Sequence, residues 1–91
     1  MEKQVVIKIY GLVQGVAFRY DAQHLAKELD LKGWVKNESN GSVRIVVRGK
    51  EDGLKKLVDW CYQGPKSARV DKVELKWEEP VQKFNNFDIE F

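Results

Sequence analysis

The sequence predicts an α+β domain in which two helices cover one face of an antiparallel sheet. Five segments carry apolar residues at alternate positions, and two carry them every three to four positions; these are the periods of strands and helices. In chain order the segments read β-α-β-β-α-β, followed by a short C-terminal strand. A chain of 91 residues fits one domain, so we expect residues 1–91 to fold as a single unit.

The first half of the chain predicts a strand, a helix and the start of a hairpin. Residues 4–10 alternate as a strand does, and the glycine-bearing stretch 11–15 follows them. The helix then presents one apolar face, made of Phe18, Ala22, Leu25, Ala26 and Leu29. Strands at 32–37 and 42–48 are joined by a turn containing Asn40-Gly41, which is a strong hairpin signal.

The second half predicts another helix and two further strands. Glu51 and Asp52 favour a helix start, and Gly64-Pro65 ends that helix. Its apolar stripe comprises Leu54, Leu57, Val58 and Cys61. Alternating apolar residues at 73–77 and 87–91 predict the fourth strand and the short fifth.

This order of elements is that of the split βαβ, or ferredoxin-like, sandwich. A right-handed crossover makes the first and second strands parallel, with the third between them. Parallel strands end at the same edge of a sheet, so the loop at 11–18 and Asn37 should emerge side by side. Their backbones would lie about 10 Å apart, a gap that an arginine side chain can largely bridge.

Composition and charge narrow the classes of function. The net charge is +2, with 16 basic and 14 acidic side chains spread along the chain, which does not indicate a nucleic-acid or membrane partner. One histidine and one cysteine, far apart, have no metal-ligand spacing, and we expect no metal or cofactor. No apolar leader opens the chain, and the lone Cys61 favours a reducing compartment, so we expect a cytoplasmic protein.

The loop before the first helix has the features of an anion site. No Ser, Thr, Asp or Asn stands where it would cap the helix, which leaves the first N–H groups without side-chain partners. Arg19 in the first turn opposes the helix dipole unless an anion binds there, and its guanidinium offers a planar fork to two phosphate oxygens. On these grounds alone, an ordinary glycine loop with a solvated arginine is the commoner interpretation of such a stretch.

Two longer motifs resemble a known family. Ile9-x-Gly11-x-Val13-Gln14-Gly15-Val16-x-Phe18-Arg19 resembles the first signature of the acylphosphatases. Gly33-Trp34-Val35-Lys36-Asn37, with Gly41-x-Val43 and Gly49, resembles the second. The resemblance covers essentially the whole chain, and it implies a ferredoxin-like hydrolase that cleaves the carboxyl–phosphate bond of acyl phosphates.

The resemblance also implies a role for each site residue. Arg19 and the backbone N–H groups of residues 14–19 would bind the substrate phosphate, and Asn37 would hold the attacking water. The amides concerned are those of Gln14, Gly15, Val16, Ala17, Phe18 and Arg19. No metal or cofactor is implied. We expect an acyl phosphate as substrate, inorganic phosphate as product and inhibitor, and a monomer.

A few residues depart from the family pattern. Ala17 stands at a tolerant position, and Asp21 replaces a larger residue near the site, where its charge would slightly weaken phosphate attraction. Asp30 replaces a common glycine at the end of the first helix, and residues 38–40 replace a proline-containing turn. None of these departures removes a functional residue.

Two other functions compete with hydrolysis. An anion-sensing module of the same fold would need Arg19 but not Asn37. The hairpin does not explain Asn37 either, because Asn40-Gly41 already makes the turn. An RNA-binding module would stack bases on aromatic residues of a central strand, and residues 42–48 contain none. His24 lies outside the apolar helix face, and we expect it to be solvated rather than catalytic.

Overall fold

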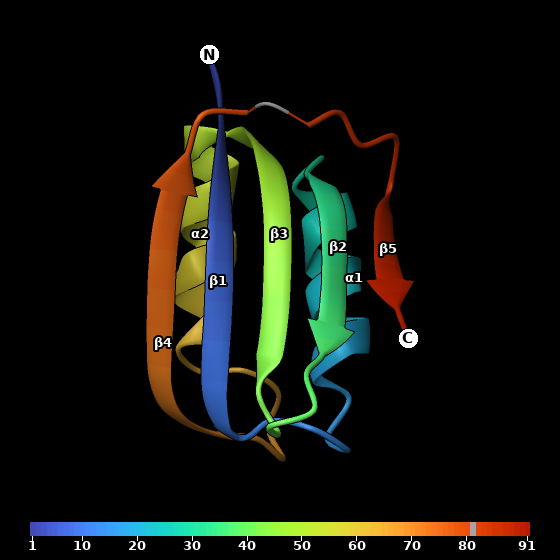
Figure 1. Ribbon diagram of the computed structural model, residues 1–91, viewed down its shortest axis with the longest axis vertical. Helices are drawn as coiled ribbons and strands as arrows, with labels where there is room; N and C mark the ends of the chain where they lie inside the picture. The colour runs from blue at the N-terminus through green and yellow to red at the C-terminus, as the bar shows by residue number, and fades with distance from the viewer. Residues whose placement is uncertain (81) are drawn as a thin grey trace.

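The computed structural model describes residues 1–80 and 82–91, and it shows two helices packed on a five-stranded sheet (Figure 1). The predicted order of elements is confirmed. In chain order the elements are β1 (Glu2–Leu12), α1 (Phe18–Glu28), β2 (Lys32–Asn37), β3 (Val43–Lys50), α2 (Glu51–Cys61), β4 (Arg69–Glu78) and β5 (Phe87–Glu90).

The strand order β4-β1-β3-β2-β5 is that of the predicted split βαβ sandwich. β3 pairs antiparallel with both β1 and β2, so β1 and β2 run parallel with β3 between them, as expected. The sheet is mixed rather than wholly antiparallel, because β5 pairs parallel with β2. The reason is topological: β4 runs opposite to β2 and ends where β2 begins, so the chain enters β5 from that same end (Figure 1).

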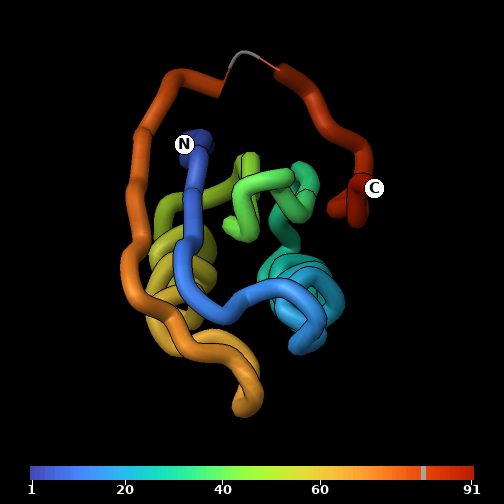
Figure 2. Tube along the Cα trace, turned by 60° about the horizontal axis from the view of Figure 1, so that its bottom comes forward, coloured from blue at the N-terminus to red at the C-terminus, as the bar shows by residue number. Residues whose placement is uncertain are grey.

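Both helices cover the same face of the sheet, and the core lies between (Figure 2). α1 packs on β2 and β5, and α2 packs on β1 and β3. The alternate residues predicted to point inward are buried, among them Val5, Ile7, Ile9, Val43, Ile45 and Val47. Each such side chain stabilises the fold by about 1.5–3 kcal/mol. Cys61 is buried on α2, and desolvation raises the pKa of its thiol.

The strand predicted at 4–10 extends to Leu12 because Gly11 forms a β-bulge instead of ending it. The register of β1 against β4 shifts between Tyr10 and Gly11, and the φ angle of Gly11 is +133°. A Cβ on Gly11 would lie 2.2 Å from the carbonyl oxygen of Arg69, so the bulge needs glycine. The extension pairs β1 with the start of β4, which therefore begins at Arg69, ahead of the predicted 73–77.

Apolar alternation predicts burial poorly at the edges of the sheet. Leu75 and Trp77 of β4 are 38% and 42% exposed, and Phe91 after β5 is 87% exposed. β4 lies beyond the strands on which α2 packs, so its inward face is incompletely covered. Neither helix of the described residues has the length and apolarity that a membrane crossing requires.

Candidate active site

The loop between β1 and α1 leaves the sheet beside the turn that joins β2 to β3 (Figure 1). Gly15 and Ala17 in this loop both have left-handed backbone conformations, with φ of +74° and +65°. Ala17 is the N-cap of α1 and is followed directly by helical Phe18. A left-handed residue beside a right-handed one is the geometry of backbone nests, whose N–H groups converge on anions.

The N-terminus of α1 has no side-chain cap, as the sequence predicts. The first intrahelical bond is donated by the Asp21 N–H to the Ala17 carbonyl, at 3.1 Å. The N–H groups ahead of Asp21 therefore have no partner within the helix. Together with the positive end of the helix dipole, they make a site that favours a phosphate group.

The side chain of Gln14 ties this loop to the β2–β3 turn. Its Nε2 donates to the carbonyl oxygens of Glu38, at 2.8 Å, and Ser42, at 2.9 Å. The same two residues close the turn, since the Glu38 N–H donates to the Ser42 carbonyl at 2.8 Å. Gln14 therefore sets the loop against the strand end that carries Asn37. Only the backbone of Gln14 was predicted to have a role, because spacing along the chain does not reveal a bond between distant turns.

Gln14→Glu is expected to lower both stability and activity. The carboxylate cannot donate, so it would face two carbonyl oxygens with neither hydrogen bond made. Each lost hydrogen bond costs about 0.5–1.5 kcal/mol, and repulsion between the carboxylate and the two carbonyl oxygens would move the loop away from the turn. Thermal unfolding and kcat/KM should both fall. A variant that is destabilised but has wild-type kcat/KM would show that Gln14 does not position the loop.

A small cavity lies where the loop, α1 and β2 meet. Its volume is about 120 Å³, and its walls are Val13, Gly15, Ala17, Phe18, Arg19, Tyr20 and Asn37. Arg19 and Asn37 therefore line the same space, as the parallel arrangement of β1 and β2 predicts. The cavity is also lined by three of the other predicted site residues, Gly15, Ala17 and Phe18, but not by Gln14 or Val16. Two further lining residues, Val13 and Tyr20, were not predicted.

Asn37 is the last residue of β2, opposite Val43 of β3. Its side-chain Oδ1 is buried and has no hydrogen-bond partner among the described residues. An unpaired buried acceptor costs about 1–3 kcal/mol, so the structure keeps this carboxamide at a cost to stability. In folded proteins a buried acceptor of this kind typically binds an ordered water or takes part in function.

Arg19 packs against the C-terminal residue of the chain. Its guanidinium carbon lies 5.0 Å from the centre of the Phe91 ring, in a cation–π contact. β5 brings Phe91 there: it pairs with β2, and Gln23 of α1 donates to the Phe87 carbonyl at 2.9 Å. The sequence predicted Phe91 only as part of a strand. The spacing of residues along the chain does not show that the Phe91 ring packs against Arg19 of α1.

Phe91→Ala is expected to raise KM several-fold and to change kcat less. An exposed cation–π contact contributes about 0.5–1 kcal/mol, which here limits the conformations of the Arg19 side chain. Phe91→Leu keeps apolar bulk without the ring's negative face, and it should resemble the alanine variant. Steady-state kinetics would contradict the role of the ring if the leucine variant matched the wild type.

No His, Cys, Asp or Glu side chain of the described residues lines this cavity. His24 is exposed, with Nε2 3.3 Å from Glu28 one helical turn later, as expected for a solvated histidine. Asp21 is exposed in the first turn of α1 and does not line the cavity. In residues 1–80 and 82–91, no three His, Cys, Asp or Glu side chains are grouped so that they could hold a metal ion.

Comparisons with known proteins show which proteins this chain resembles. The family model named Acylphosphatase matches residues 5–89. An acylphosphatase of Chloroflexus aurantiacus is 47% identical over 89% of this chain and 88% of its own. Two crystallised acylphosphatases superpose closely. That of Bacillus subtilis has a TM-score of 0.94 at 33% identity and full coverage of both chains. That of Coxiella burnetii has a TM-score of 0.93 at 36% identity, over 98% of this chain and 93% of its own.

Proposed function

Because this chain belongs to the acylphosphatase family, whose members hydrolyse acyl phosphates, we propose that Arg19 and Asn37 perform that hydrolysis here. Arg19 and the N–H groups of residues 14–19 hold the phosphate, and Asn37 holds the attacking water. The observation that supports these roles is the shared cavity: the guanidinium, the uncapped start of α1 and the unpaired Asn37 carboxamide meet around it.

The chemistry requires positioning more than acid or base catalysis. An acyl phosphate has a carboxylate as its leaving group, which departs without protonation. Transfer of its phosphoryl group depends on neutralised oxygens and a water held in line with the bond that breaks. The Arg19 guanidinium and the helix N–H groups supply the first requirement, and the Asn37 side chain supplies the second.

The bonds and protons balance without a further group from the protein. The water oxygen forms a bond to phosphorus, and the bond from phosphorus to the carboxyl oxygen breaks with its electron pair. The water proton passes to a phosphate oxygen of the substrate, because a carboxamide is too weak a base to take it at neutral pH. The products are a carboxylate and inorganic phosphate.

Hydrolysis of benzoyl phosphate in the presence of EDTA tests this proposal. The wild-type protein should turn over with EDTA present, and inorganic phosphate should inhibit competitively. Turnover that stops with EDTA and returns with a divalent cation would contradict the metal-free mechanism. Phosphate binding without any hydrolysis would indicate the anion-sensing module instead.

A further inference from the structure

The cavity that Arg19 and Asn37 share is too small to hold a whole acyl phosphate. Its volume of about 120 Å³ is what roughly four water molecules occupy in the liquid. A phosphate group and the attacking water would largely fill that space, so the acyl group of the substrate has to lie at the mouth. The residues at the mouth therefore decide which acyl groups bind well.

Tyr20 has the large exposed side chain at this mouth. Among the described residues that line the cavity, Gly15 and Ala17 are exposed as well, but they carry no more than a methyl group. Val13 and Phe18 are buried, whereas Tyr20 is 60% exposed. Side chains of a helix are directed back toward its N-terminus, so the Tyr20 ring lies over the first turn of α1, beside the cavity that it lines.

The position of Tyr20 on α1 places it across the cavity from the sheet. Successive residues of an α-helix are about 100° apart, so Tyr20 lies about 200° around the helix from Phe18. Phe18 and Ala22 are buried in the core between α1 and the sheet. Asn37 ends β2, one of the strands on which α1 packs. The cavity therefore has Asn37 on its sheet side and Tyr20 on its solvent side.

In-line transfer sets the direction in which the acyl group leaves. The attacking oxygen, the phosphorus and the leaving oxygen lie roughly on one line. The next step rests on the proposed function, in which Asn37 holds the attacking water. With the water on the Asn37 side of the phosphorus, the carboxyl oxygen is on the opposite side, toward the solvent face of α1 and Tyr20.

We infer that the Tyr20 ring binds the acyl group of the substrate, and that the enzyme favours acyl phosphates whose acyl group is flat and apolar, above all an aromatic one. Two aromatic rings pack edge to face or offset, and such a contact corresponds to about two- to tenfold in a binding constant. An acetyl group is too small to cover the ring and gains little from it. Tyr20 sets specificity, and the phosphoryl transfer itself is left to Arg19 and Asn37.

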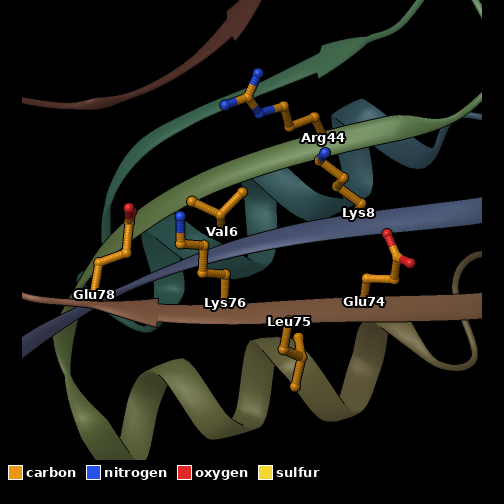
Figure 3. A pocket seen from close by; sticks show the side chains of 7 residues that line it. All are labelled: Val6, Lys8, Arg44, Glu74, Leu75, Lys76 and Glu78. Atoms are coloured by element: carbon orange, nitrogen blue, oxygen red, sulfur yellow. The ribbon is translucent and has the colours of Figure 1, made fainter.

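A larger hollow on the helix-free face of the sheet does not compete for the acyl group. Its volume is about 650 Å³, and Figure 3 shows Lys8, Arg44 and Lys76 around it, on β1, β3 and β4. None of the described residues that line this hollow also lines the cavity of Arg19 and Asn37. An acyl group attached to a phosphate in the cavity therefore meets Tyr20 and not this hollow.

Benzoyl phosphate and acetyl phosphate, which differ only in the acyl group, test the contact. The measured quantity is the ratio of kcat/KM for benzoyl phosphate to kcat/KM for acetyl phosphate, because effects on the shared phosphate chemistry largely cancel in it. Tyr20→Ala should lower this ratio by about two- to tenfold. Tyr20→Phe keeps the ring without the hydroxyl and should preserve the ratio. Alanine has the higher helix propensity, so Tyr20→Ala should stay folded, which circular dichroism checks.

Phe91→Ala is the matched control, since Phe91 is also an exposed aromatic residue but contacts Arg19. It should raise KM for both substrates alike and leave the ratio as in the wild type. A ratio that falls with Phe91→Ala and stays constant with Tyr20→Ala would overturn the inference, because the acyl group would then lie beside β5.

Binding of a non-hydrolysable analogue tests the contact without the reaction. Phenacylphosphonate has a methylene group where benzoyl phosphate has its bridging oxygen. Its competitive inhibition constant should rise by about two- to tenfold with Tyr20→Ala, whereas that of inorganic phosphate should stay the same. Nuclear Overhauser effects should connect its phenyl protons with the Tyr20 ring. Effects that connect them with Phe91 instead would contradict the assignment.

The kinetic results separate this inference from the proposed hydrolysis. A wild type that hydrolyses both substrates, with the same ratio in Tyr20→Ala, would overturn the role of Tyr20 and leave the hydrolysis intact. A wild type that hydrolyses neither substrate would overturn the hydrolysis, and the role of Tyr20 with it.

Discussion

Replacing Arg19 with glutamine is expected to abolish both turnover of benzoyl phosphate and binding of inorganic phosphate. Arg19 supplies the side-chain positive charge of the cavity it shares with Asn37, and a glutamine amide carries no charge. Loss of one well-placed group that stabilises the transition state reduces kcat by about a hundred- to a thousandfold, and loss of a charge that also binds the substrate adds to this. Steady-state kinetics measure the loss of turnover, and isothermal titration calorimetry with inorganic phosphate measures the loss of binding.

The stability of Arg19→Gln should change little. A cation in the first turn of a helix is unfavourable by about 0.3–1 kcal/mol, so its removal relieves α1. Loss of the contact with Phe91 costs about 0.5–1 kcal/mol, which offsets that relief. Thermal unfolding would therefore separate a lost function from a lost fold.

A matched control is available for this substitution. Arg44 also lies near an aromatic ring, with its guanidinium carbon 5.6 Å from the centre of the Trp34 ring, but on β3 and outside the cavity. Arg44→Gln should keep wild-type kinetics and phosphate inhibition. If Arg19→Gln binds inorganic phosphate with the wild-type dissociation constant, the phosphate site lies elsewhere.

Asn37→Ala is expected to reduce kcat by at least about a hundredfold and to change KM only slightly. The carboxamide holds the water rather than the phosphate, so its removal affects the reaction more than the binding of substrate. Stability should not fall, because Oδ1 of Asn37 has no hydrogen-bond partner to lose. Kinetics and thermal unfolding of the same preparation measure the two effects together.

Asn40 provides the matched control for Asn37 in the same hairpin. Its Oδ1 accepts from the backbone N–H of Ser42, at 3.1 Å, and from the Ser42 hydroxyl, at 2.6 Å. Asn40→Ala should therefore lower the unfolding temperature and leave kcat near that of the wild type. A kcat for Asn37→Ala close to the wild-type value would show that this carboxamide does not position the water.

Local patterns predicted the fold because they are strong here and agree with one another. The alternation of Val5, Ile7 and Ile9 matches the buried face of β1, and the spacing of Phe18, Ala22 and Ala26 matches that of α1. With those elements in order, a right-handed crossover leaves little freedom in the topology. The convergence of Arg19 and Asn37 follows from the same topology, since β1 and β2 end at one edge.

Contacts between distant segments are what the sequence could not predict. Gly11 reads as a strand end, yet it is a bulge, because the carbonyl of Arg69 approaches it closely. The bonds from Gln14 to the β2–β3 turn and the packing of Phe91 on Arg19 join residues far apart in the chain. No periodicity encodes such pairs, since each depends on where the folded elements place loops and termini.

Nuclear magnetic resonance during a titration with inorganic phosphate tests the central claim most directly. The backbone N–H signals of residues 14–19, the Arg19 Nε–H and the Asn37 side-chain amide should shift together and with one dissociation constant. The face of the sheet that carries Lys8, Arg44 and Lys76 should not respond. Shifts confined to that basic face, with the α1 loop and Asn37 unchanged, would contradict a phosphate site between β1, α1 and β2.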